Sequence, residues 1–337
     1  PSSAASDVYK RQIMRLHQWL TGMAVAVSCA ASLAAQASPF PDKPVRFIAP
    51  TAAGSAPDII TRLVADKLGQ RWGQPVIVEN RPGGNGIIGM NALTRADADG
   101  YTLAMFHAAA AVTTPFLYQA AKFDIERDTD VVATLAYTPM MLVTTPGTPY
   151  RTVADLVAAA KGGESSDLVI GSPTRGSIPS LSVYLMGQLS GRDFRQVSFS
   201  GTSQALQTLI KGDIPVYIDG VAPLVPLVRA GKLIPIAMSA DQTLPGFENI
   251  PLVGATLPGM VTSGWFAVFA PKGTPASVLD SLHGAINEVL QAPDVQGRLA
   301  DIGTFPMIKS RSEAGAFVHG EKTKWGEVIS KAQVKAE

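Results

Sequence analysis

Short apolar segments of strand type alternate with segments of helical spacing along most of this chain. In the first repeat, VRFIA is followed by a turn of small residues and then by apolar positions at a helical period. Strands separated by helices indicate βαβ units, so we predict an α/β fold with a largely parallel sheet. The expected strands are 45–49, 76–78, 101–106, 168–170, 196–199, 216–219, 233–238 and 265–270. The expected helices are 59–72, 87–95, 153–161, 181–189, 203–210, 224–230, 278–290, 295–302 and 314–330.

The alternation falls into two units, because it restarts after Pro149. The last third of the chain is mainly helical and has too few strands to be a domain of its own, so we expect it to complete the first unit. The sequence therefore predicts two lobes. Lobe 1 is discontinuous and comprises residues 38–145 and 263–337, and lobe 2 comprises residues 146–262.

The N-terminal stretch has the three parts of an export signal. Arg15 provides the positive charge, residues 20–33 form an apolar run too short to span a bilayer, and AQA before Ser38 fits a small-residue cleavage site. We predict that residues 14–37 are a cleaved signal peptide and that the mature protein, from Ser38, works outside the cytoplasm. We interpret residues 1–13 as an artificial leader or an assembly scar.

The single cysteine of the sequence, Cys29, lies inside this predicted signal. Lipidation of Cys29 is the rival interpretation, but Ala26 stands where a lipobox usually has leucine. Past Ser38 the chain offers no thiol for a disulfide or a metal. The formal net charge of the chain is +1, which gives no reason to expect a nucleic acid or an anionic membrane as partner.

Few groups that could carry catalysis follow the signal. Of the histidines His107, His283 and His319, we interpret the last two as surface residues of helices. The sequence contains no HExxH, GxSxG or GxxxxGK[ST] pattern, so we predict neither a metal site nor an enzyme. GNGIIG (84–89) fits the bare dinucleotide fingerprint, but no acidic residue ends the following strand at the expected distance. We favour a glycine turn that begins a helix, and we expect no cofactor.

Four strands run into small, backbone-exposing residues and then into a helix. Helix N-termini carry unpaired N–H groups and a partial positive charge, so several of them around one cleft make an anion site. The alternative for each loop is an ordinary N-cap or turn. Four such loops in one two-lobed chain favour the ligand cleft. The loops are 51–55, 83–86, 172–177 and 200–203.

Three longer patterns carry a family resemblance: ENRPGGNG (79–86), DGYTL (99–103) and GWFAVFAPKGTP (264–275). With them, nearly the whole chain from Phe40 to about Lys331 resembles the Bug-type extracytoplasmic solute receptors, the binding proteins of tripartite tricarboxylate transporters. The resemblance implies a two-lobed periplasmic binding protein (Venus-flytrap) fold whose lobes close on a small ligand by hinge motion. It further implies a di- or tricarboxylate, acidic amino acid or aromatic acid as ligand, and the membrane subunits of the transporter as partners. We expect a monomer.

The resemblance places the ligand among loops of both lobes, held by backbone groups, hydroxyls and water. The residues expected to bind it are Thr51, Ala52, Gly54, Ser55, Asp58, Asn85, Gly86, His107, Ser172, Thr174, Arg175, Ser177, Ser200, Gly201, Thr202 and Asp219.

Several of these assignments leave alternatives open. Asp58 aligns with the family's loop-to-helix aspartate, which either braces the loop or touches the ligand. Arg175 and His107 depart from the usual small residues, and each is a candidate partner for a second carboxylate. The alternatives are a solvated Arg175 and a His107 that only packs. Tyr137 and Phe199 are candidates for stacking on an aromatic acid.

Two other functions fit parts of the sequence. A sensing receptor would use the same closed form but present it to a membrane sensor kinase, and the sequence does not separate this role from transport. An exported hydrolase would need a nucleophile, a histidine and an acid in one set, and no such set is evident.

Overall fold

The computed structural model describes residues 40–160 and 168–334. The predicted leader and signal peptide, residues 1–37, lie outside the described residues. The chain divides into two compact units, Pro1–Asp42 and Lys43–Glu337. Every helix and strand described here lies in the second unit.

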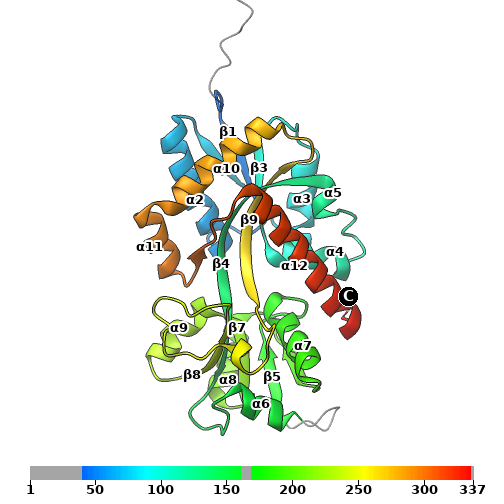
Figure 1. Cartoon of the computed structure of the whole chain (residues 1–337), viewed down its shortest axis with the longest axis vertical. Coiled ribbons are helices and arrows are strands. Elements are labelled where there is room, and N and C mark those ends of the chain that lie inside the picture. The colour runs from blue at the N-terminus through cyan, green and yellow to red at the C-terminus, as the bar shows by residue number, and fades with distance from the viewer. Residues whose placement is uncertain (1–39, 161–167, 335–337) are drawn as a thin grey trace, which may run out of the picture. The chain divides into compact units, whose positions relative to one another are not determined.

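The described residues form one ten-stranded mixed sheet that is covered by helices (Figure 1). The strands are β1 (Val45–Ala49), β2 (Val76–Asn80), β3 (Thr102–His107), β4 (Thr129–Thr144), β5 (Val169–Ser172), β6 (Arg195–Ser198), β7 (Val216–Gly220), β8 (Ile234–Ser239), β9 (Ser263–Pro271) and β10 (Phe305–Pro306). The helices are α2 (Ala56–Trp72), α3 (Ile87–Thr94), α4 (Thr114–Leu117), α5 (Ile125–Asp128), α6 (Val153–Ala159), α7 (Ile178–Ser190), α8 (Thr202–Lys211), α9 (Val221–Arg229), α10 (Ala276–Gln291), α11 (Pro293–Asp301) and α12 (Arg311–Ala332). Shorter turns are η1 (Gly84–Gly86), η2 (Ala109–Thr113) and η4 (Val253–Ala255).

The sequence located the alternating elements well. Each expected strand is present, and each expected helix is present with its ends within about one turn. The long strand β4 was not expected. Its segment is apolar without clean alternation and contains Pro139, a residue that is rare inside central strands.

The prediction of a largely parallel sheet is wrong for the middle of the sheet. The strand order is β2-β1-β3-β9-β4-β7-β5-β6, with β8 and β10 also paired to β4. β1 runs parallel to β2 and β3, and β5 runs parallel to β6 and β7, as helical crossovers require. β4 and β9 pair antiparallel with their neighbours, since no βαβ crossover links them to those strands.

β4 belongs to both groups of parallel strands. Thr129–Pro139 pairs with β9, and Met140–Thr144 pairs with β7 and β8. Pro139, which has no N–H to donate to a ladder, lies where β4 changes partners. Figure 1 shows β4 and β9 side by side between the two groups of helices. The lobe boundaries at residues 145 and 263 stay a prediction.

The core follows both groups of strands. Phe47 in β1, Phe106 in β3 and Phe269 in β9 are fully buried, and the rings of Phe106 and Phe269 meet edge to face at 5.9 Å. Around β7, Tyr217 packs among residues of β4, α8 and α9. The C-terminal α12 packs on β4, on η2 and on α7, so it contacts elements of both groups.

Candidate functional site

A cavity of about 640 Å³ opens where the N-terminal ends of several helices face the strands β4 and β9. Its walls come from both groups of parallel strands: η2 follows β3, the 173–179 segment follows β5, and α9 follows β7. The lining residues used below are Ala56, Pro57, Asn85, His107, Tyr118, Thr138, Met140, Thr174, Arg175, Gly176, Ser177, Ile178, Thr202, Asp219, Gly220, Ala222, Gly264, Trp265, Phe266, Ile302 and Thr304.

Four helices direct their N-terminal ends at this cavity. α2 contributes its first two residues, α7 its cap and first residues, α8 its first residue, and α9 its cap residue Gly220 and Ala222. Each N-terminus adds unpaired N–H groups and a partial positive charge. α2, α7 and α8 follow three of the four predicted loops, whereas α9 follows none of them and α3, after the loop 83–86, contributes no lining residue. A convergence of helix N-termini suits a negatively charged ligand.

Two charged side chains belong to the lining, and both come from the β5–β7 group. Arg175 is exposed, and no side chain among the described residues pairs with its guanidinium. Asp219 is only 8% exposed. Its Oδ2 accepts hydrogen bonds from Thr202 Oγ1 and Tyr217 Oη, both at 2.7 Å, and its Oδ1 accepts one from the Gly220 N–H at 2.7 Å. Burial raises the pKa of Asp219 despite these bonds.

His107 ends β3 and presents a neutral imidazole to the cavity. Burial lowers the pKa of His107 to about 4. Its Nδ1 accepts a hydrogen bond from the Ala110 N–H at 3.4 Å. The proton of the neutral ring is therefore assigned to Nε2, so this side chain offers a donor without a charge.

Asp58 holds the first loop together and does not line the cavity. Its carboxylate is 2% exposed. Oδ2 accepts from the Gly54 N–H at 2.8 Å and from Arg62 Nε at 3.0 Å, and Oδ1 accepts from Asn80 Nδ2 at 2.7 Å. Burial alone would raise the pKa of Asp58, but these hydrogen bonds outweigh it and lower the pKa below its usual value. The geometry therefore favours bracing over ligand contact.

Most of the hydroxyls in the predicted loops already have local partners. Ser55 Oγ donates to the Ala52 carbonyl at 2.7 Å, and Ser177 Oγ donates to the Thr174 carbonyl at 2.6 Å while it caps α7. Ser200 Oγ donates to Gln204 Oε1 at 2.7 Å. These are the bonds of ordinary caps and turns. The anion-binding capacity of the cavity therefore depends on backbone N–H groups and Arg175 more than on hydroxyls.

The comparisons with known proteins decide the family. Residues 60–334 match the model of the tripartite tricarboxylate transporter family receptor. The chain belongs to this receptor family. Protein BugT of Bordetella pertussis is 28% identical to the receptor over 301 residues, covering 89% of this chain and 92% of BugT. This relationship confirms the Bug-type resemblance.

Solved structures agree with the assignment. An R. palustris protein determined with adipate is 28% identical to the receptor, with a TM-score of 0.72, and covers 88% of this chain and 99% of its own. MatC from Rhodopseudomonas palustris with bound malate is 27% identical, with a TM-score of 0.69, and covers 86% and 100%. The α/β, two-lobed periplasmic binding fold is thereby confirmed.

Part of the predicted site comes together in the cavity of the receptor. The predicted residues that line it are Asn85, His107, Thr174, Arg175, Ser177, Thr202 and Asp219. The predicted residues outside its lining are Thr51, Ala52, Gly54, Ser55, Asp58, Gly86, Ser172, Ser200 and Gly201. Ligand contact by any of them stays a prediction.

Loop reasoning missed the part of the lining that comes from strands and from one turn. β4 contributes Thr138 and Met140, β9 contributes Trp265 and Phe266, and Ile302 with Thr304 comes from the turn between α11 and β10. A hydrogen bond to α12 fixes the indole of Trp265, because Nε1 donates to Glu321 Oε2 at 2.9 Å. For Trp265 and Phe266 a signal was present in the motif GWFAVFAPKGTP, which predicts a strand and not a loop.

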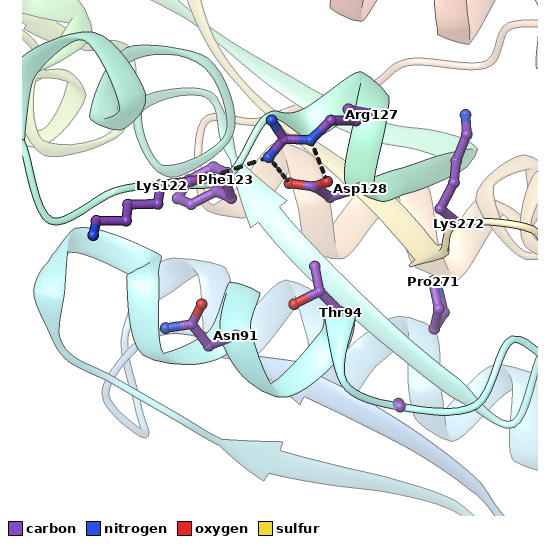
Figure 2. Close-up of a pocket in the computed structure, with 9 residues that line it drawn as sticks. Asn91, Thr94, Lys122, Phe123, Arg127, Asp128, Pro271 and Lys272 are labelled. Carbon is purple, nitrogen blue, oxygen red and sulfur yellow. Dashed lines mark hydrogen bonds and ion pairs between the residues drawn. The ribbon is translucent and has the colours of Figure 1, made fainter.

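A second hollow of about 430 Å³ lies beside α3 and α5 and carries basic residues (Figure 2). Arg127 is committed to Asp128 through two 2.7 Å contacts. Figure 2 shows the ammonium groups of Lys122 and Lys272 directed away from this pair on opposite sides. The cations do not converge on one ligand, so the hollow is a weaker candidate than the helix-lined cavity.

Two further properties of the described residues, 40–160 and 168–334, bear on membrane insertion and metal binding. None of the helices in this part of the chain is long and apolar enough to cross a bilayer. Among the same residues, no cluster of three histidine, cysteine, aspartate or glutamate side chains could hold a metal ion.

Proposed function

We propose that the receptor captures a small organic acid in the helix-lined cavity by hinge closure and delivers it to the membrane subunits of a tripartite tricarboxylate transporter. The signal at residues 14–37 exports it to the periplasm, where the mature protein begins at Ser38. It acts by binding and release and carries out no chemical step on its ligand.

The convergence of the helix N-termini and Arg175 on one cavity carries this proposal. Backbone N–H groups at four helix ends and the guanidinium of Arg175, which no side chain of the described residues pairs with, offer a carboxylate both hydrogen bonds and charge. Between them the wall is apolar, with Met140, Ile178 and Phe266 placed to contact a hydrocarbon body. This pattern of a polar end and an apolar middle fits an organic acid better than it fits a sugar or a cation.

The relatives support the ligand class. Adipate and malate, each present in a relative's structure, are both small dicarboxylates. Their identity to this chain is below one third, so the class transfers as a proposal and the individual acid does not. Asp219 in the lining also bears on the choice of acid, because a negative wall repels a second carboxylate that comes close to it.

A thermal-shift screen tests the proposal on the protein that begins at Ser38. The panel holds adipate, malate, aromatic acids, tricarboxylates and acidic amino acids at about 1 mM. A ligand present at about 1,000 times its Kd adds about 4 kcal/mol to the unfolding free energy, which raises Tm by several degrees. We expect a clear shift with one class of acid, and no shift with any acid would overturn the proposal.

Two arginine variants locate the binding. Arg175→Ala removes the guanidinium from the cavity and should weaken binding about 10- to 100-fold, because a hydrogen bond to a charged group contributes about 1.5–3 kcal/mol. Arg192→Ala is the matched control, since Arg192 lies at the turn after α7 and lines a different hollow. Equal losses in both variants would remove Arg175 from the site.

A further inference from the structure

Two buried glycines lie in close contact with neighbouring elements at the cavity wall. Gly303 lies in the turn between α11 and β10, with φ at +62°. A Cβ placed on Gly303 would lie 2.8 Å from Ala222 Cα and 3.0 Å from Ala222 N. Both atoms are backbone of the first turn of α9. They cannot give way unless the helix itself moves.

The second contact involves Gly176, in the segment that leads into α7, with φ at +75°. A Cβ there would lie 2.7 Å from Cδ1 of Leu117, the last residue of α4. Leu117 is 6% exposed and belongs to the main hydrophobic cluster, so little space is available to it. Gly176 and Tyr118, the residue after Leu117, both line the cavity.

Each contact joins elements from opposite sides of the point where β4 changes partners. Gly303 precedes β10, which pairs with β4 at Ala136 and Tyr137, on the β9 side of Pro139. Ala222 follows β7, which pairs with β4 from Met140 onward. In the same way α4 follows β3, and Gly176 follows β5. A hinge motion about β4 and β9 therefore has to open or close both contacts.

The contact between Gly303 and Ala222 separates the ligand cavity from another hollow on the outer side. Ala222 lines the ligand cavity, and Ala222 and Gly303 together line an outer hollow of about 360 Å³. The rim of that hollow includes Phe247 and Phe305, whose rings meet edge to face at 6.3 Å.

We propose that Gly303 and Gly176 determine ligand affinity through their contacts with the facing wall, because only glycine lets the two walls of the cavity meet as they do in this structure, and that this arrangement belongs to the closed form. A side chain at either position holds the cavity open. This inference rests on the proposed function, since it assumes that closure accompanies ligand capture. Apparent affinity falls in proportion to the population of the closed form, so a tenfold loss of that population gives a tenfold higher Kd.

The chain offers matched controls for both substitutions. Gly303→Ala combines the strain of a positive φ with the clash against α9. Gly191→Ala has the same strain, at φ +63°, but no atom within 4 Å of the new Cβ. Gly231→Ala, at φ +68° with open space, serves in the same way for Gly176→Ala. Any difference in affinity or radius of gyration within a pair is therefore due to the clash of the new Cβ and not to backbone strain.

Two measurements read the effect. Small-angle scattering of the protein without added ligand should give a larger radius of gyration for Gly303→Ala than for Gly191→Ala and the unchanged protein. Calorimetric titration with adipate, and with malate, should give a Kd about tenfold higher for Gly303→Ala than for Gly191→Ala. Gly176→Ala should show a smaller change than Gly303→Ala, because it meets a side chain and not a backbone.

The outcomes separate this inference from the proposed function. Equal radii and equal affinities within each glycine pair would overturn the inference and leave the receptor function standing. If neither acid binds the unchanged protein and the thermal-shift panel gives no shift, the carboxylate function fails, and the scattering comparison still decides whether the glycines set the closed form.

Discussion

Two buried aspartates of the receptor lie next to a helix N-terminus, and their surroundings affect the charge differently. Asp58, in the first turn of α2, contacts Arg62 and accepts hydrogen bonds from Gly54 and Asn80, and its pKa is lowered. Asp219, in β7 just before α9, has only neutral donors, and burial raises its pKa. The charge of Asp58 is compensated by Arg62, and Asp58 lies outside the cavity lining. The charge of Asp219 has no such compensation, and Asp219 lies in the cavity wall.

This difference assigns separate tasks to the two sides of the cavity. On the α2 side, Asp58 braces the loop through its hydrogen bonds, and this side offers the ligand mainly backbone dipoles and the neutral His107. The β5–β7 side holds both charged groups of the lining, Arg175 and Asp219. Under the proposed function we therefore expect discrimination among acids to reside on the β5–β7 side, and the predictions below test that division.

The largest effect is expected for Asp58→Ala, which should lower the unfolding free energy by about 3 kcal/mol. The substitution removes a nearly fully buried carboxylate and leaves the Gly54 N–H and the Asn80 amide without their acceptor. Urea unfolding measures the change. Asp66→Ala, at an exposed acid of the same helix, should stay within about 0.5 kcal/mol. An Asp58→Ala cost as small as this control would show that the loop needs no brace.

Asp219→Asn should affect the ligand more than the fold. At a pH above the raised pKa of Asp219, removing its negative charge from the cavity wall should strengthen binding of a dicarboxylate such as adipate, by about 1 kcal/mol or roughly fivefold in Kd. Calorimetric titration of the variant beside the unchanged protein gives the ratio. Tyr217→Phe is the control, since it removes one hydrogen bond to Asp219 and keeps the charge. Weaker adipate binding in Asp219→Asn would place the ligand's donor groups, and not its carboxylates, at this wall.

The elements were predictable where local chemistry determines them. The helix from 59 and the strand at 45–49 follow from periodicity, and Pro57 in the first turn of α2 suits its place. β4 was not predicted, because its interior proline and its continuous apolar run do not fit a simple strand pattern. Its antiparallel pairing with β9, over a separation of more than a hundred residues, has no signature in local spacing.

The sequence predicted the kind of site, an anion site at strand-to-helix loops, but not the individual residues that line it. Small residues between strand and helix located four loops, but no spacing rule tells which of them opens to the cavity or which hydroxyls are already bonded. Asn85 shows the limit: it lines the cavity, yet its amide donates to Thr114 Oγ1 at 3.0 Å. The turn carrying Ile302 and Thr304 arrives from the far end of the chain, so only the folded structure shows its place in the wall.

The two aspartates should give stability opposite dependences on pH. Asp58 has a lowered folded-state pKa, so its contribution is present above its ordinary pKa of 3.8 and is lost as pH falls through the folded value. Asp219 has a raised folded-state pKa, so unfolding free energy falls as pH rises from 3.8 through the folded value. Each unit of pKa difference corresponds to about 1.4 kcal/mol.

Urea midpoints measured from about pH 3 to about pH 7 test this contrast. We compare the unchanged protein with Asp58→Asn and with Asp219→Asn, because subtracting each variant isolates one carboxyl from the other acids. The two difference curves should slope in opposite directions. Parallel curves would remove the distinction between a compensated and an uncompensated aspartate.

The smallest effect is expected at the serines that precede α7 and α2. Ser177 caps α7 by accepting the Ser180 N–H at 3.4 Å, whereas Ser55 precedes α2 without a capping hydrogen bond from its side chain. Ser177→Ala should therefore cost about 1 kcal/mol of unfolding free energy and Ser55→Ala clearly less, because the capping role of Ser55 is absent and Asp58 already holds its loop. Urea unfolding of the two variants side by side gives the difference. Equal costs would show that the α2 loop depends on Ser55 as well, and that its rigidity does not come from Asp58 alone.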